Sequence, residues 1–158
     1  MSSVFDRLVE VLNRSEITYN VLRHDPVFTS EEAAHVRGTP LASGAKALIC
    51  KVDSGFVMFV LPADRKLDGR AVRRSKGWRK VRFASTEEVA ALTQLAPGAI
   101  PPFGSLFGLR TLCDRQLGQN ETINFNAGDH GISMSLRFSD YLLVEQPELG
   151  EFSDHPSG

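Results

Sequence analysis

The segment 98–104, which reads Gly-Ala-Ile-Pro-Pro-Phe-Gly, is the part of this chain best suited to chemistry. Pro101 and Pro102 each fix their backbone φ at about −65° and donate no backbone hydrogen bond, whereas the flanking glycines permit angles that other residues resist. The remaining backbone amides could therefore point at a carbonyl group or an oxyanion. A segment rich in proline and glycine can also simply turn the chain, so the residues alone leave both interpretations open.

Lys46 is the second candidate, because it opens the apolar run 46–50 directly after Ser-Gly-Ala. Strand alternation places Lys46 on the same face as Leu48 and Cys50. A lysine on an inward strand face is costly unless its ammonium reaches a partner or a cleft, which makes Lys46 a candidate site residue. The alternative is that its side chain extends from the end of the strand into solvent.

The usual catalytic motifs do not occur in this sequence. It contains no Gly-x-Ser-x-Gly, no His-Glu-x-x-His and no phosphate-binding loop, and its four histidines lack the spacing of a metal-ligand pair. Cys50 and Cys113 lie in apolar runs, where a thiol is usually a small core side chain rather than a nucleophile. We therefore expect no metal and no cofactor, and if the chain is a hydrolase its nucleophile is water.

The basic residues are concentrated in one segment. Nine of the eighteen lysines and arginines lie within residues 65–82, opposed there only by Asp68, so this segment carries a net charge of +8 and the rest of the chain −9. Such a chain can present a cationic face to a polyanion, with Trp78 as a stacking surface, although a plain solvated surface is the alternative. The residues expected to contact a nucleic acid are Arg70, Arg73, Arg74, Lys76, Arg79 and Lys80.

Length and composition favour a single domain in the cytoplasm. A chain of 158 residues can bury about two-thirds of its unfolded surface, and its two cysteines suggest no disulfide framework. The longest apolar run, residues 56–61, is too short to cross a bilayer, and the N-terminus lacks a basic stretch followed by an apolar one. We therefore expect a cytoplasmic protein with no membrane partner.

Apolar periodicity and capping residues predict alternating helices and strands. Capping boxes at Thr29 with Glu32 and at Ser85 with Glu88 mark two helix starts, and Ser139 is expected to cap the last helix. The expected helices are 5–12, 29–37, 68–76, 85–94 and 141–144, and the expected strands are 19–23, 45–52, 56–61, 79–83, 109–113, 122–125 and 132–136. We expect a domain of residues 1–150 followed by a flexible tail, 151–158.

Three short motifs follow one another along the chain: Gly-Ala-Lys-Ala-Leu at 44–48, the 98–104 segment, and Phe-Asn-Ala-Gly at 125–128. In this order they resemble the YbaK/ProX family of aminoacyl-tRNA editing domains, and the resemblance covers about residues 3–150. Members occur as free-standing proteins or as the insertion domain of bacterial prolyl-tRNA synthetases. The resemblance implies an α/β (α+β) fold, a single compact domain whose mixed, strongly curved, barrel-like sheet is flanked by helices.

The resemblance also implies a trans-editing deacylase, which hydrolyses the ester between a wrong amino acid and the terminal adenosine of tRNA. Because this ester has a neighbouring ribose hydroxyl that can position or activate water, a side-chain base is not required. Lys46 would act as a protonated positioner, since the ordinary lysine pKa is about 10.4. The implied catalytic residues are Lys46, Gly98, Ala99, Ile100, Pro101 and Pro102, and the implied substrate-binding residues are Phe103, Gly104, Asn126, Gly128 and His130.

A small acyl group, seryl, threonyl or alanyl, is favoured, because rejecting a smaller side chain by binding gains only about 1–3 kcal/mol per methylene. The expected partner is aminoacyl-tRNA, with a synthetase or an elongation factor as a further partner. One alternative is a non-catalytic adaptor that binds aminoacyl-tRNA or a synthetase, and another is a hydrolase of other small acyl esters. His130 can also be an ordinary loop histidine, because the sequence departs from the synthetase insertion domains around residues 126–130.

Overall fold

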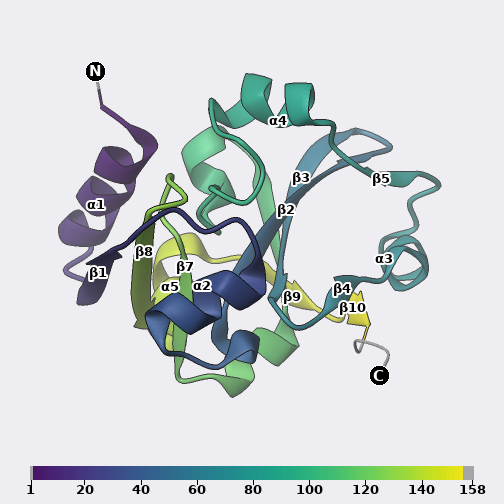
Figure 1. Cartoon of the computed structure of the whole chain (residues 1–158). Helices are drawn as coiled ribbons and strands as arrows, with labels where there is room; N and C mark the ends of the chain where they lie inside the picture. The colour runs from purple at the N-terminus through teal and green to yellow at the C-terminus, as the bar shows by residue number, and fades with distance from the viewer. Residues whose placement is uncertain (1, 155–158) are drawn as a thin grey trace.

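The computed structural model describes residues 2–154, whose strands pair into three sheets. The largest sheet has the order β5-β2-β3-β6-β9, the second has the order β1-β8-β7, and β4 pairs with β10 (Figure 1). The strands are β1 Tyr19–Arg23, β2 Ala45–Val52, β3 Gly55–Pro62, β4 Lys66–Leu67, β5 Val81–Phe83, β6 Arg110–Asp114, β7 Thr122–Asn126, β8 Ile132–Arg137, β9 Glu148–Gly150 and β10 Ser153–Asp154.

The helices begin where side chains satisfy the first backbone amides. Ser3, Thr29 and Ser85 each accept from the amide three residues on and complete the capping boxes of three helices. The helices are α1 Val4–Arg14, α2 Ser30–Arg37, α3 Gly69–Lys76, α4 Thr86–Thr93 and α5 Phe138–Glu145, with short 3₁₀ turns η1 Leu41–Ser43, η2 Gly104–Phe107 and η3 Arg115–Gln119. Helix α5 begins earlier than expected, at Phe138 with Arg137 as its N-cap, so Ser139 is not its cap.

The hairpin of β2 and β3 forms the centre of the large sheet. The two strands pair antiparallel with Lys46 opposite Leu61, and β5 adds to the outer edge of β2 with Phe83 opposite Cys50. On the other side, β3 pairs parallel with β6 and β6 pairs parallel with β9. The hairpin predicted from the sequence is confirmed, and β2 contributes Lys46 near its start.

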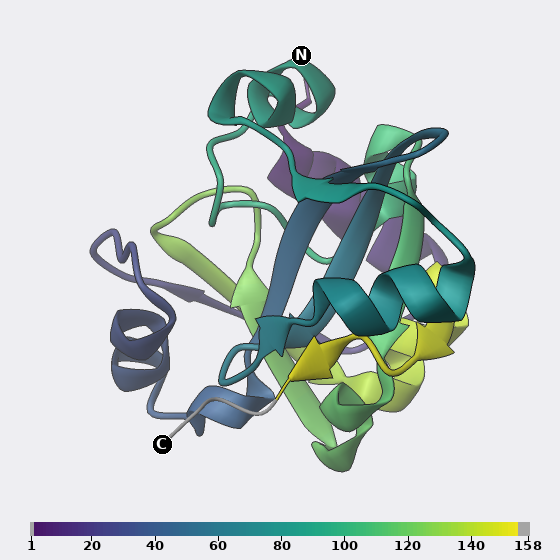
Figure 2. The same ribbon diagram turned by 90° about the vertical axis from the view of Figure 1, so that its right-hand side faces the viewer.

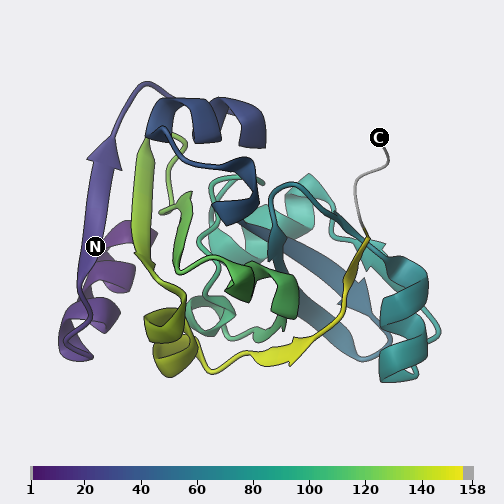
Figure 3. The ribbon, with the colours of Figure 1, turned by 90° about the horizontal axis from the view of Figure 1, so that it is seen from below.

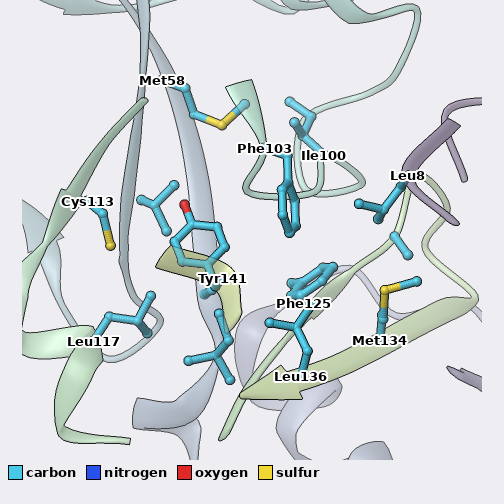
Figure 4. Close-up of a cluster of buried hydrophobic side chains, with 14 of the residues drawn as sticks. Leu8, Met58, Ile100, Phe103, Cys113, Leu117, Phe125, Met134, Leu136 and Tyr141 are labelled. Carbon is cyan, nitrogen blue, oxygen red and sulfur yellow. The ribbon is translucent and has the colours of Figure 1, made fainter. Parts of the chain in front are cut away.

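The two larger sheets enclose the larger of two apolar clusters, and the smaller cluster holds Phe59 and Phe152. Figure 3 shows β1, β8 and β7 on one side of the molecule and the β2–β3 hairpin with α3 on the other. Between them, Phe103 packs edge-on against Phe125 and Tyr141, with ring centroids 5.6 and 5.2 Å apart (Figure 4). The predicted mixed α/β single domain is confirmed, whereas the pairing over residues 2–154 gives open sheets, so closure into a barrel stays a prediction. Over the same residues, no helix combines the length and apolar character needed to cross a membrane.

Residues 148–154 are part of the packed domain, which differs from the expected tail. Strand β9 pairs with β6, and β10 pairs with β4. Phe152 is 1% exposed, its ring lies edge-on to Phe59 at 5.5 Å, and its backbone amide donates to Asp114 Oδ2 at 2.7 Å. The expectation of a tail is therefore wrong for residues 151–154, and residues 155–158 lie outside the described part of the chain.

Replacing Phe152 by alanine should lower the free energy of unfolding by about 3–5 kcal/mol, because it removes a fully buried ring and leaves a cavity. Chemical denaturation followed by circular dichroism measures this loss. Leu143→Ala is the control, since Leu143 is 68% exposed and its truncation should change stability by no more than about 0.5 kcal/mol. A loss below about 1 kcal/mol for Phe152→Ala would contradict the packing of this segment.

Candidate active site

A pocket of about 310 Å³ lies against the first half of β2. Helix α2 and the turn before it line one wall, and the segment that follows α4 lines another. Figure 2 shows β2 in the centre, α2 to one side of it and α4 above. Lys46 lines this pocket together with Gly98 and Ile100, so the two candidate elements of the sequence meet at one site.

The 98–104 loop is held at almost every backbone polar group. The Gly98 carbonyl accepts from Asn126 Nδ2 at 2.6 Å, and the Ala99 carbonyl accepts from the Gly128 amide at 2.8 Å. Farther along, the buried Tyr141 hydroxyl donates to the Pro102 carbonyl at 2.7 Å. These contacts fix the loop from three separate elements, and its residues 99–104 are all buried.

The backbone amides of the loop fall into two groups, those with an acceptor and those without one. The amides of Ala99, Phe103 and Gly104 donate to Ala96, Pro101 and Thr111, respectively. Among the described residues, by contrast, no acceptor pairs with the amides of Gly98 and Ile100, the two residues of the 98–104 loop that line the pocket. Two fixed amides without partners are the donors that a developing oxyanion requires.

Lys46 carries a partly buried ammonium in this pocket. Its Nζ donates to the Arg65 carbonyl, at the start of the segment that leads to β4. Burial lowers the pKa of Lys46 from its ordinary value, while the nearby carboxylates of Asp64 and Glu31 raise it. Asp64 Oδ1 is itself buried and has no hydrogen-bond partner among the described residues. The Asp64 carboxylate therefore helps to keep Lys46 charged.

Arg37 is a site residue that the sequence analysis missed. It lines the pocket from the end of α2, where Nε donates to Ser133 Oγ at 2.8 Å and Nη2 donates to Asn126 Oδ1 at 2.9 Å. Asn126 in turn holds Gly98, so its role in the structure is to position the loop. Burial lowers the pKa of Arg37 to about 10. In the sequence this arginine is indistinguishable from the cations that commonly end helices.

His130 lines the same pocket and faces two of its other residues. Its ring lies 4.7 Å from that of Phe28, and a Cβ added to Gly98 would stand 3.3 Å from His130 Cε1. His130 Nδ1 is buried and has no hydrogen-bond partner among residues 2–154. A buried polar atom on a pocket wall is a site where a ligand can supply the missing hydrogen bond.

Several predicted site residues lie outside the pocket. Phe103 is a core side chain, and Gly104 donates its amide to Thr111 Oγ1 at 3.0 Å. The residues of the predicted site that do not line the pocket are Ala99, Pro101, Pro102, Phe103, Gly104 and Gly128. The predicted site residues that do line it are Lys46, Gly98, Ile100, Asn126 and His130.

Among the described residues, neither the two cysteine thiols nor the acidic side chains form a second candidate catalytic or metal site. Burial raises the pKa of Cys50 and of Cys113 to about 12, so both remain protonated thiols within the core. Within the described residues, no group of histidine, cysteine, aspartate and glutamate side chains is arranged to hold a metal ion.

The sequence model of the aminoacyl-tRNA editing domain family matches residues 24–142 of this chain. This range includes α2, Lys46, the 98–104 loop and β7. The chain belongs to this family. Over 156 residues it is 36% identical to the multifunctional Ser/Thr-tRNA deacylase ProXp-y of Escherichia coli K12, a match that covers 96% of this chain and 93% of the relative.

Two further comparisons agree with this membership. The prolyl-tRNA editing protein ProX of Acetoanaerobium sticklandii is 24% identical, with coverage of 84% of this chain and 85% of the relative. A solved structure described as a trans-editing enzyme for prolyl tRNA synthetase superposes on this chain with a TM-score of 0.84 at 22% sequence identity. The superposition covers 98% of this chain and 99% of that protein's chain. The structural match shows that the fold is shared.

The basic residues predicted to contact nucleic acid lie in different places on this editing domain. A groove on β2 and β5, called here the basic groove, is lined by Lys51, Val52, Asp53, Arg73, Arg79, Lys80, Val81 and Arg82. Of the predicted nucleic-acid contacts, Arg73, Arg79 and Lys80 line it. The exposed Arg70 and Arg74 lie elsewhere on α3, and Lys76 is paired with Glu148. The sequence analysis missed Lys51 and Arg82, which the antiparallel pairing places opposite each other.

Replacing Asp64 by asparagine should lower the pKa of Lys46 further, because the ammonium loses the carboxylate that most favours its charged form. Glu31→Gln should lower it by a smaller amount. The chemical shifts of Lys46 Cε and Nζ, followed by NMR against pH in lysine-labelled protein, report this pKa directly.

Asp53→Asn is the matched control, since the Asp53 carboxylate accepts from the Arg79 and Lys80 amides and is not among the groups that shift Lys46. An unchanged Lys46 pKa in Asp64→Asn would show that this carboxylate does not stabilise the ammonium.

Proposed function

We propose that this chain is an aminoacyl-tRNA deacylase that acts in trans and removes a small, wrongly attached amino acid from tRNA. One observation carries the proposal: Lys46 and the two loop residues whose amides have no partner among the described residues, Gly98 and Ile100, line one pocket. Family membership and the deacylase named among the relatives support the same activity.

The chemistry requires only water and groups that are already fixed. Water attacks the ester carbonyl carbon, and the amides of Gly98 and Ile100 donate to the oxygen that becomes negative. The Lys46 ammonium lies near this charge and fixes the acyl-adenosine end of the substrate. The neighbouring ribose hydroxyl orients the water; the ester C–O bond then breaks, the ribose oxygen takes up a proton, and the amino acid leaves.

Seryl and threonyl groups suit this pocket best. His130 Nδ1 is buried without a partner, and the hydroxyl of a serine or threonine side chain would supply its missing hydrogen bond. Helix α2 contributes the small side chains of Ala33 and Ala34 to the pocket lining. The name of the Escherichia coli relative, a Ser/Thr-tRNA deacylase, supports this choice.

We also propose that the tRNA backbone follows the basic groove. Arg79 and Lys80 are exposed there, and Asp53 holds their backbone amides at 2.9 and 2.8 Å. The Lys76 ammonium already has Glu148 as its partner, so it contributes less than Arg79 and Lys80. Delivery of the substrate by a synthetase or an elongation factor, and a cytoplasmic location, stay predictions.

The purified protein should release serine and threonine from mischarged tRNA, and Lys46→Ala should lower this rate by at least 100-fold, because the substrate loses the cation proposed to fix its acyl-adenosine end. Radiolabelled seryl-, threonyl- and alanyl-tRNA provide the substrates, with the spontaneous hydrolysis of each subtracted. Arg115→Ala is the control, since Arg115 is an exposed cation at the start of η3 that lines neither the pocket nor the basic groove.

Unaltered thermal unfolding of Lys46→Ala would establish that the fold persists. Tight binding of aminoacyl-tRNA without release would instead identify a non-catalytic adaptor, and release from short esters alone would identify a general esterase. Full activity of Lys46→Ala would remove this residue from the mechanism.

Charge reversal in the basic groove should flatten the salt dependence of tRNA binding. The double variant Arg79→Glu, Lys80→Glu should reduce the slope of log affinity against log salt by about 0.7–0.9 for each phosphate contact that is lost. Arg70→Glu, Arg74→Glu changes the net charge equally outside the groove, and its slope should stay closer to that of the wild type. Equal slopes for the two double variants would contradict a specific path along the groove.

A further inference from the structure

Phe83 is a large apolar side chain that the fold leaves uncovered. It is the last residue of β5 and is 60% exposed. Isolated exposed apolar residues are common on protein surfaces and need no explanation. Phe83 differs from an isolated one because it lines the pocket that contains Lys46.

The strand register fixes where this ring stands relative to Lys46. Phe83 pairs with Cys50, and the next amide, that of Ala84, donates to the Ile49 carbonyl at 2.9 Å. Alternation along β2 places Cys50 on the same face as Lys46. Phe83 therefore stands on the Lys46 face of the sheet, four residues or about 13 Å along the strand.

The same strand connects the pocket to the basic groove. Arg82 and Val81, the two residues before Phe83, line the groove, whereas Phe83 lines the pocket. Figure 1 shows β5 running alongside β2 at the edge of the sheet. Strand β5 therefore contributes to both sites, and along this strand Phe83 stands where the groove residues give way to the pocket.

We propose that the Phe83 ring is a stacking platform for the base that precedes the terminal adenosine of aminoacyl-tRNA. The inference rests on the proposed function, because the acyl-adenosine must occupy the pocket beside Lys46. The 3′ end of tRNA is single-stranded, so its bases are free to stack on an aromatic face, which every base can do through its π system. The phosphate on the far side of this nucleotide then enters the basic groove.

The position of the ring favours a base over the other parts of the substrate. The acyl-adenosine is proposed to lie beside Lys46, and Phe83 stands about 13 Å along the strand from that lysine. A phosphate gains nothing from an apolar ring, whereas it is attracted by Arg82 and Lys51 in the adjoining groove. The combination of an exposed ring and neighbouring cations is typical of surfaces that bind single-stranded nucleic acid.

The test compares two substrates with the same acyl group, seryl-tRNA and the minimal ester 3′-seryl-adenosine, which lacks the preceding nucleotide. Phe83→Ala should lower kcat/KM for seryl-tRNA roughly 5- to 150-fold, the range expected when one base loses its aromatic platform. It should leave kcat/KM for seryl-adenosine unchanged. Phe83→Trp should retain activity on both substrates, whereas Phe83→Leu, which is apolar but has no ring, should lose activity on seryl-tRNA alone.

Leu143→Ala is the control for removal of an exposed apolar side chain, since Leu143 is 68% exposed on α5. Equal losses on both substrates would place Phe83 in the acyl-adenosine site and overturn the proposal. No loss on either substrate would also overturn it and leave the ring as a contact for a protein. If the wild-type protein hydrolyses neither substrate, the proposed function fails instead.

Discussion

The attachment of the 98–104 loop is the constraint on which the site depends. Three hydrogen bonds, from Asn126, the Gly128 amide and the Tyr141 hydroxyl, fix three of its carbonyl groups, and Phe103 anchors it in the core. Because these contacts come from β7, the turn after it and α5, the loop cannot shift without disturbing the core. The donors that remain are therefore already oriented when a substrate arrives, which is how a site without a side-chain base can stabilise a transition state.

The pocket also concentrates positive charge in a partly buried place. Burial disfavours the charged forms of Lys46 and Arg37, and different neighbouring groups stabilise the charge of each side chain. Lys46 has the carboxylates of Asp64 and Glu31 nearby, whereas Arg37 donates to the neutral oxygens of Ser133 and Asn126. The pocket therefore favours a bound group that gains negative charge during the reaction over a group that remains neutral.

The sequence predicted the elements whose signals are local. Capping boxes and the turn between β2 and β3 are set by residues a few positions apart, and they are found where expected. Lys46 and the 98–104 loop could be paired because the family resemblance supplied the long-range link that local patterns do not carry. Residues 151–154 were expected to belong to a tail because this short segment has little apolar periodicity, although Phe152 is buried beside Phe59.

The remaining errors have a common cause, since they concern which side of an element faces the ligand. The sequence does not show that Phe103 points into the core while Ile100 of the same loop lines the pocket. Likewise, Arg37 joins the site only because α2 packs beside β7, and Lys51 joins the basic groove only because β5 adds to β2. Such placements are decided by the packing of distant segments.

The backbone of Gly98 has a consequence for how this pocket can diversify. Its φ of +91° disfavours any side chain, and an added Cβ would press on the His130 ring at 3.3 Å. This wall is therefore closed to gradual substitution. Residues on regular structure, such as Ala34 on α2, are better placed to change acyl preference during evolution or engineering, because a larger side chain there meets no backbone strain.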